Sequence, residues 1–187
     1  STRPTLTVLP PHREVFATTN QTKRFRHGFF ATVVNRAHKR PPPVDVEGVA
    51  NSLGLTVHYA WLDDGISGEL VRLPSGDYQI NVHADDPSTR QRFTIAHEIG
   101  HYVYHRDLID KGIDDNRAYR STGEGRFHNR NIGPAQETQA NRFAATLLMP
   151  NNMVADLRAA GSDRRGMAEK LEVSEHAMAI RLGEPYP

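Results

Sequence analysis

Residues 97–101 read His97-Glu98-Ile99-Gly100-His101, the pattern H-E-x-x-H. Residues four apart on a helix project from one face about one turn apart, so the two imidazoles can converge on a single metal ion. Glu98 lies roughly 100° around the helix from His97 at 3.6 residues per turn. From there its carboxylate can reach a water activated by the metal without being a ligand. The pattern therefore predicts a metal-dependent hydrolytic site with Glu98 as the general base.

The sequence around this pattern favours a helix. Asp86-Pro87-Ser88-Thr89 is a strong helix start, with Asp86 as the expected N-cap and proline at the first helical position. We expect the helix to run through Leu108 to Gly112. The apolar side chains that would bury one side of it are Phe93, Ile99 and Val103.

Two histidines leave a catalytic zinc ion short of protein ligands, because such sites usually use three ligands and a water. The chain has no cysteine, so any metal must bind His, Asp or Glu. In metzincins a further histidine follows ten positions after the first, but that position is Asp107 here, and Tyr104 takes the place of the required glycine. His105 continues the stripe of His97 and His101, but three ligands on one straight helix cannot surround an ion tetrahedrally. A supporting or packing role is expected for His105.

Glu137 is the best candidate for the third ligand. It opens a predicted helix, roughly Ala135 to Leu148, in which Ala140 and Ala144 fall near its own face. Small residues there would let this helix approach the first one at Gly100 and bring a carboxylate within about 2 Å of the ion. The alternative role for an N-terminal glutamate is to complement the helix dipole.

Before these helices, the hydrophobic period indicates two helices and then strands. Helical spacing covers Phe29 to Lys39, and a short second helix follows with Asp45 as its N-cap. Strands are predicted over residues 55–61, 68–73 and 78–83. The turn at residues 74–77 makes the last two a hairpin, and residues 113–134 are expected to form a surface loop.

With 187 residues, the chain fits one domain with small additions. We expect a basic N-terminal arm at residues 1–25, a core at 26–150 and a C-terminal helical subdomain at 151–187. Residues 1–43 carry eight Lys and Arg against one acid, a balance of +7, so the remaining residues carry −6. Such an arm can approach nucleic acid, but a solvated tail is favoured.

No run of 18 apolar residues and no apolar signal-peptide stretch is present in the sequence. We therefore expect a soluble, cytoplasmic protein with no membrane partner. The sequence gives no indication of its oligomeric state.

Three stretches resemble the IrrE/ImmA-type metallopeptidases of bacteria and their mobile elements. They are Arg92 to His101, Glu137 to Ala145 and Leu147 to Pro150, and a weaker likeness covers residues 44–183. The resemblance implies an α+β, minimal zincin-like fold, with a small antiparallel sheet packed on the H-E-x-x-H helix and a C-terminal helical pair.

The same resemblance implies the chemistry. The ligands of a Zn²⁺ ion would be His97, His101 and Glu137, and Glu98 would be the catalytic base. The substrate would be a protein, a helix-turn-helix repressor of a stress response or mobile element. No tyrosine or histidine is identified by its spacing as the group that stabilises the oxyanion.

Two other functions compete with a peptidase. A non-catalytic, zinc-containing module could bind a partner in the manner of an antirepressor or a toxin–antitoxin protein, although the intact Glu98 argues against it. A DNA-binding regulator is suggested by residues 167–182, which resemble a short helix-turn-helix. The acids Glu169, Glu172 and Glu175 would oppose phosphates, so a packed helical pair is favoured.

Overall fold

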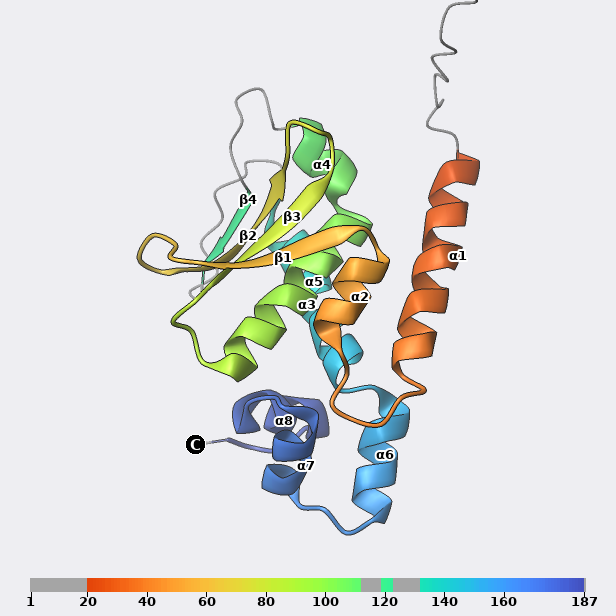
Figure 1. Ribbon diagram of the computed structural model, residues 1–187. Helices are drawn as coiled ribbons and strands as arrows, with labels where there is room; N and C mark the ends of the chain where they lie inside the picture. Colours follow the sequence, from red (N-terminus) through yellow and green to blue (C-terminus); the bar gives the residue numbers. More distant parts are fainter. Residues whose placement is uncertain (1–19, 112–118, 123–131, 187) are drawn as a thin grey trace, which may run out of the picture.

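The structure is a computed structural model that describes residues 20–111, 119–122 and 132–186. The described part contains eight helices and a four-stranded sheet, an α+β fold as expected (Figure 1). The helices are α1 (Asn20–Ala37), α2 (Val46–Ser52), α3 (Ser88–Tyr104), α4 (Arg106–Lys111), α5 (Pro134–Leu148), α6 (Asn151–Ala159), α7 (Arg164–Leu171) and α8 (Glu175–Leu182). The strands are β1 (Leu55–Ala60), β2 (Ile66–Arg72), β3 (Tyr78–His83) and β4 (Tyr119–Thr122).

The predicted hairpin is formed by β2 and β3, which pair antiparallel with Arg72 opposite Tyr78. Its turn is closed by a hydrogen bond from the backbone N–H of Leu73 to the carbonyl of Asp77, 2.8 Å long. Gly76 adopts a φ of +91°, a conformation that favours glycine. Local turn chemistry was therefore sufficient to predict this pairing.

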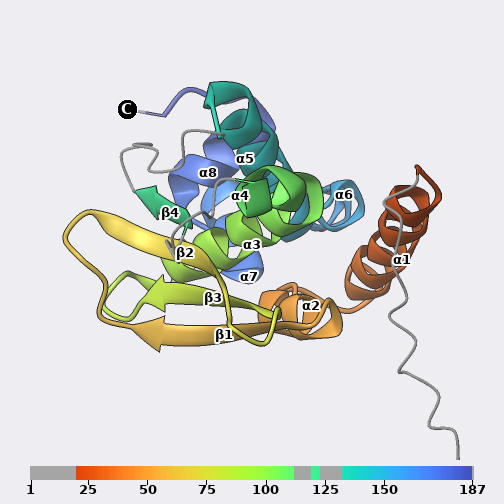
Figure 2. The same cartoon turned by 90° about the horizontal axis from the view of Figure 1, so that it is seen from above.

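The sheet as a whole is mixed, not purely antiparallel. Its strand order is β1-β3-β2-β4, and β1 pairs parallel with β3. The chain passes from β1 to β2 without pairing them, and the hairpin then returns β3 into the space between (Figure 2). The pairing of β1 depends on this crossover, which no local turn signal encodes.

The prediction of a surface loop at residues 113–134 is wrong for Tyr119–Thr122. These residues form β4 and pair antiparallel with β2, with Tyr119 opposite Leu70. Four residues are too few to show a hydrophobic period, so the strand depends on its neighbour for definition. Residues 112–118 and 123–131, which make up most of the predicted loop, lie outside the described residues.

The core lies between the sheet and α3. Tyr78, Ile80 and Val82 alternate along β3 and are buried on one face, while the residues between them are partly exposed. Helix α3 lies against this buried face, and α5 lies on the far side of α3 (Figure 2). The helix that carries the H-E-x-x-H pattern is thus enclosed between the sheet and a second helix.

Helix α3 differs from the prediction at both ends. It begins at Ser88 with Pro87 as the N-cap residue, and no described side chain forms a capping hydrogen bond there, so the prediction of Asp86 as N-cap is wrong. Its last residue is Tyr104, not Leu108 to Gly112. His105, with φ −120° and ψ 1°, is the C-cap, and its carbonyl accepts the backbone N–H of Leu108 as α4 begins.

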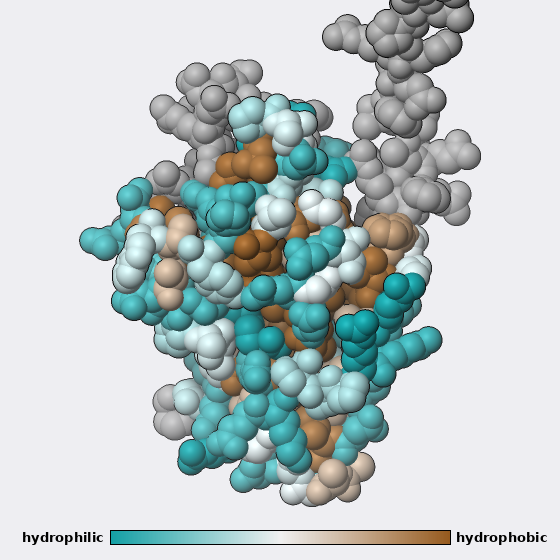
Figure 3. Space-filling model, viewed as in Figure 1, coloured by the Kyte–Doolittle hydropathy of each residue, from teal (hydrophilic) through white to brown (hydrophobic). Residues whose placement is uncertain are grey.

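The flanking helices follow local rules more closely. The Asp45 side chain caps α2 by accepting a 2.9 Å hydrogen bond from the N–H of Gly48, as predicted. Helix α1 begins at Asn20, earlier than the pattern indicated, and Phe30 on it packs against Tyr104 and Phe143. None of the described helices is long and apolar enough to cross a membrane. Polar residues cover most of the face shown in Figure 3, with apolar residues in smaller areas between them.

Candidate metal centre

Helices α3 and α5 pack closely because the residues at their crossing are small. A Cβ atom on Gly100 would lie 3.2 Å from the Cα of Ala140 and 2.9 Å from the Cδ1 of Phe143. Both distances are shorter than ordinary van der Waals contact, so only glycine fits at this position without a shift of its neighbours. The predicted approach of the second helix to Gly100 therefore occurs.

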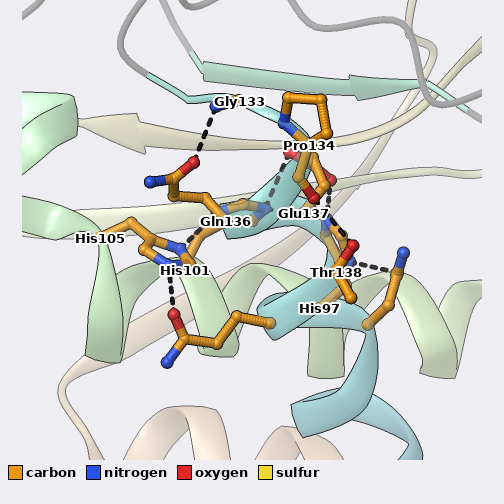
Figure 4. A network of polar contacts seen from close by, with 10 residues as sticks. His97, His101, His105, Gly133, Pro134, Gln136, Glu137 and Thr138 are labelled. Atoms are coloured by element: carbon orange, nitrogen blue, oxygen red, sulfur yellow. Dashed lines mark hydrogen bonds and ion pairs between the residues drawn. The ribbon is translucent and has the colours of Figure 1, made fainter.

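This packing brings three candidate ligands together, as Figure 4 shows. The Nε2 atoms of His97 and His101 are 2.9 Å apart. The carboxylate of Glu137 places Oε2 at 3.2 Å from the Nε2 of His97 and Oε1 at 3.2 Å from that of His101. All three residues are buried, and their ligand atoms lie within 4.8 Å of one another.

The three residues fit a zinc ion. Zinc bonds of 2.0 to 2.2 Å in a tetrahedral arrangement separate the ligand atoms by about 3.3 Å, and the observed separations of 2.9 to 3.2 Å are close to this value. Two imidazoles and one carboxylate leave one coordination position for a water or substrate. His97, His101 and Glu137 thus form a possible metal site, although such a donor set also accepts other divalent transition metals.

Burial and the nearby carboxylates act differently on the two imidazoles. Burial lowers the pKa of His101 to about 4, although its hydrogen bond with Glu137 opposes this effect. Burial also acts to lower the pKa of His97, but the hydrogen bond with Glu137 and the negative charge of Glu98 outweigh it and raise that pKa above its ordinary value. A metal ligand must be a neutral imidazole, so at pH 7 His101 is already in the required state.

Glu98, which follows the candidate ligand His97 on α3, is fully buried. Thr94 lies one turn before it, and a Cβ on Gly68 of β2 would clash with the Cγ2 of Thr94, so Thr94 packs directly on that strand. Since residues four apart share a helix face, Glu98 points towards the same strand. Glu98 directly follows His97 in the chain, and its negative charge acts to raise the pKa of His97.

Behind the ligands lies a set of polar contacts that the sequence did not fully reveal. The amide Oδ1 of Asn141 lies 2.9 Å from the Nδ1 of His97, and the Nδ1 of His105 lies 3.0 Å from that of His101. The Nε2 of His105 is 3.1 Å from the Oε1 of Gln139. His105 was expected to have a supporting or packing role, but Gln139 and Asn141 were missed. The sequence did offer one indication of their role, because they lie two and four residues after Glu137 on the same predicted helix.

Among solved structures, the chain is similar to a Mycobacterium tuberculosis transcriptional regulator, with a TM-score of 0.54 and 17% sequence identity. The alignment covers 88% of this chain and 48% of that chain, so this chain spans about half the length of the regulator. At this identity the likeness concerns the fold. A comparison with curated proteins finds no match.

A family model described as the IrrE N-terminal-like domain, a peptidase family, matches residues 50–183. The matched segment is well over half of the chain, and it contains β1 to β3, α3 and α5. It includes the two helices that hold the three candidate ligands and the candidate base. The chain therefore belongs to the IrrE N-terminal-like family of peptidases.

Proposed function

We propose that the protein is a zinc-dependent endopeptidase that hydrolyses a peptide bond in a helix-turn-helix repressor of a stress response or mobile element. The observation that carries the proposal is the convergence of His97, His101 and Glu137 from two helices, with their ligand atoms within 4.8 Å of one another. A structural role for the ion alone would not require an additional buried acid beside it. Glu98 is such an acid, and it is fully buried.

In this proposal each residue of the site has a separate role. A zinc ion bound there supplies Lewis acidity, which lowers the pKa of water towards about 7 and polarises a carbonyl. Glu98 accepts a proton from the attacking water and later delivers it to the nitrogen of the leaving amine. His97 and His101 act as neutral ligands, while Glu137 adds a negative charge that balances the ion.

The family supports a protein substrate, because its members are peptidases. The choice of a helix-turn-helix repressor is supported by the resemblance of the motif stretches to IrrE/ImmA-type metallopeptidases. These stretches carry both the ligands and the base, so the same residues would serve the same chemistry.

Replacement of Glu98 by Gln tests the base. We expect the E98Q variant to bind one equivalent of zinc as the wild type does, and to cleave a helix-turn-helix repressor encoded beside its gene at least about 100-fold more slowly. Cleavage would be followed on gels and by mass spectrometry, with and without a chelator. The matched control is E169Q, which changes an exposed glutamate that pairs with Arg165 on α7.

The result also separates the proposal from a module that binds a partner without cleaving it. Wild-type turnover by E98Q would contradict the assignment of the base. Tight binding of the repressor by both proteins, with no cleavage in the presence of zinc, would instead support the non-catalytic alternative. A helix-turn-helix protein that is not a neighbour of the gene serves as the specificity control.

A further inference from the structure

The two candidate histidine ligands are supported in different ways on the side away from the site. The Nε2 atom of each ring faces the other ring and Glu137, so each Nδ1 atom points away from the candidate metal position (Figure 4). At His97 the partner of Nδ1 is an amide oxygen of Asn141. At His101 the partner is a second imidazole, that of His105.

The hydrogen-bond chemistry fixes the tautomers of this second pair. A histidine that binds metal through Nε2 carries its proton on Nδ1 and donates it. The Nδ1 of His105 must therefore accept, which leaves its proton on Nε2. The Nε2 atom lies 3.1 Å from the Oε1 of Gln139, so its N–H donates to this amide oxygen. The chain of donors runs in one direction, from His101 through His105 to Gln139.

The local fold places His105 for this contact. It is the C-cap residue of α3, only 3% exposed, and its ring centroid lies 5.0 Å from that of His101. Gln139 and Asn141 follow Glu137 on α5, so one helix provides the carboxylate ligand, the partner of His97 and the partner of His105. The crossing of α3 and α5 thus brings together the candidate ligands and the side chains that contact them.

We propose that His105, oriented by Gln139, is a positioning residue that holds His101 in the tautomer and orientation needed to bind the metal. This inference rests on the proposed metal site and adds a function to a histidine that is not itself a ligand. Partners of this kind raise the basicity of a ligating imidazole and restrict its rotation. A histidine that merely closes the C-terminus of α3 would leave metal affinity unchanged when replaced.

The test compares two substitutions at position 105. His105→Phe retains a ring but removes the acceptor, whereas His105→Asn places an amide oxygen close to the position of the imidazole Nδ1. We expect H105F to raise the zinc dissociation constant by about 10- to 100-fold, and H105N to recover most of the affinity. Zinc affinity would be measured by competition with a chromophoric chelator. The visible absorption of the Co²⁺-loaded protein should shift in H105F and return towards the wild-type spectrum in H105N.

Two substitutions at Gln139 test the inference even if H105F fails to fold. Gln139 is exposed, so substitutions there do not disturb the core. We expect Q139L to weaken zinc binding and Q139E, which retains an acceptor, to bind at least as tightly as the wild type. H176N is the control, because the His176 ring stacks on Tyr186 at the C-terminal end of the described chain.

The outcomes distinguish this inference from the proposed function. If the wild type binds neither Zn²⁺ nor Co²⁺ stoichiometrically, the proposed function fails and this inference fails with it. If the wild type binds metal but H105F and Q139L bind it with wild-type affinity and an unchanged Co²⁺ spectrum, only the role of His105 is overturned. An equal loss of affinity in H105F and H105N would also overturn it, because the acceptor would then make no difference.

Discussion

Two closely packed helix pairs, α3–α5 and α7–α8, differ in whether they bury polar side chains as well as apolar ones. Between α3 and its neighbours α5 and β2 the buried polar residues are Ser67, Thr94, His97, Glu98, His101, His105 and Glu137. In the α7–α8 pair the buried residues are Met167, Ala168, Leu171, Val173, Met178 and Ala179. The charged residues of this second pair remain at the surface, where Arg165 pairs with Glu169 and Glu175.

The two helix pairs also differ in how the ends of their helices are capped. The side chains of Asp163 and Ser174 cap α7 and α8, and Glu172 and Gly183 close them in the left-handed conformation. The N-cap residues of α3 and α5, Pro87 and Gly133, form no side-chain cap, and at α5 only the Oε1 of Gln136 accepts the backbone N–H of Gly133, at 3.1 Å. The α7–α8 pair thus follows the local rules of helix stability.

Burial of titratable groups opposes folding unless they are paired or bind a metal. Departures from local rules are expected where structure serves a function. The α3–α5 pair therefore combines apolar packing with a buried polar site, whereas the α7–α8 pair buries apolar side chains alone. Four measurements test this difference between the two pairs.

The largest expected effect is the response of folding to metal. Free zinc at about 1,000 times its dissociation constant should stabilise the protein by about 4 kcal/mol, which corresponds to a rise in Tm of about 10 °C for a chain of this size. Differential scanning calorimetry with zinc and with a chelator would measure it. Glu137→Gln should lose most of the shift. A shift of equal size in E137Q would show that the stabilising ion binds elsewhere.

Replacement of Leu171 by Ala tests the apolar pair. Leu171 is fully buried, so the truncation should reduce the free energy of unfolding by about 3 kcal/mol through lost burial and a cavity. Urea denaturation of the zinc-free protein would measure this loss. Zinc affinity of the folded variant should remain that of the wild type. A parallel loss of zinc affinity would show that the two pairs are coupled.

Replacement of Gly100 by Ala tests the close crossing of α3 and α5. Alanine favours a helix by about 1 kcal/mol over glycine, but its Cβ would meet Phe143 and the backbone of Ala140 at the distances given above, and overpacking costs about 1 to 3 kcal/mol. We expect a net loss of up to about 2 kcal/mol in stability, together with weaker zinc binding. A stabilised variant with normal zinc affinity would show that the crossing accommodates an additional methyl group at position 100.

The smallest expected effect is at a helix cap of the second pair. The hydroxyl of Ser174 accepts a 3.1 Å hydrogen bond from the N–H of Ala177, and Ser174→Ala should cost about 1 kcal/mol. Thermal unfolding would measure this loss. Zinc affinity and cleavage should not change, and S174T, which retains a hydroxyl, is the matched control.

Much of the candidate site could be predicted from local patterns. The spacing of His97 and His101 fixes their common helix face, and Ala140 on the later helix marks the side that approaches Gly100. The hairpin of β2 and β3 and the cap at Asp45 were also predicted, because turn and capping chemistry involve residues only a few positions apart.

Local sequence patterns were enough to identify the residues that could bind a metal and the helices that carry them. The parallel pairing of β1 with β3, the strand at Tyr119–Thr122 and the ligand partners Asn141 and His105 became known only from the packing of the chain. Periodicity describes one element at a time, whereas these features depend on how distant elements pack. The end of α3 at His105 also depends on packing, because the His105 ring contacts Gln139 of α5.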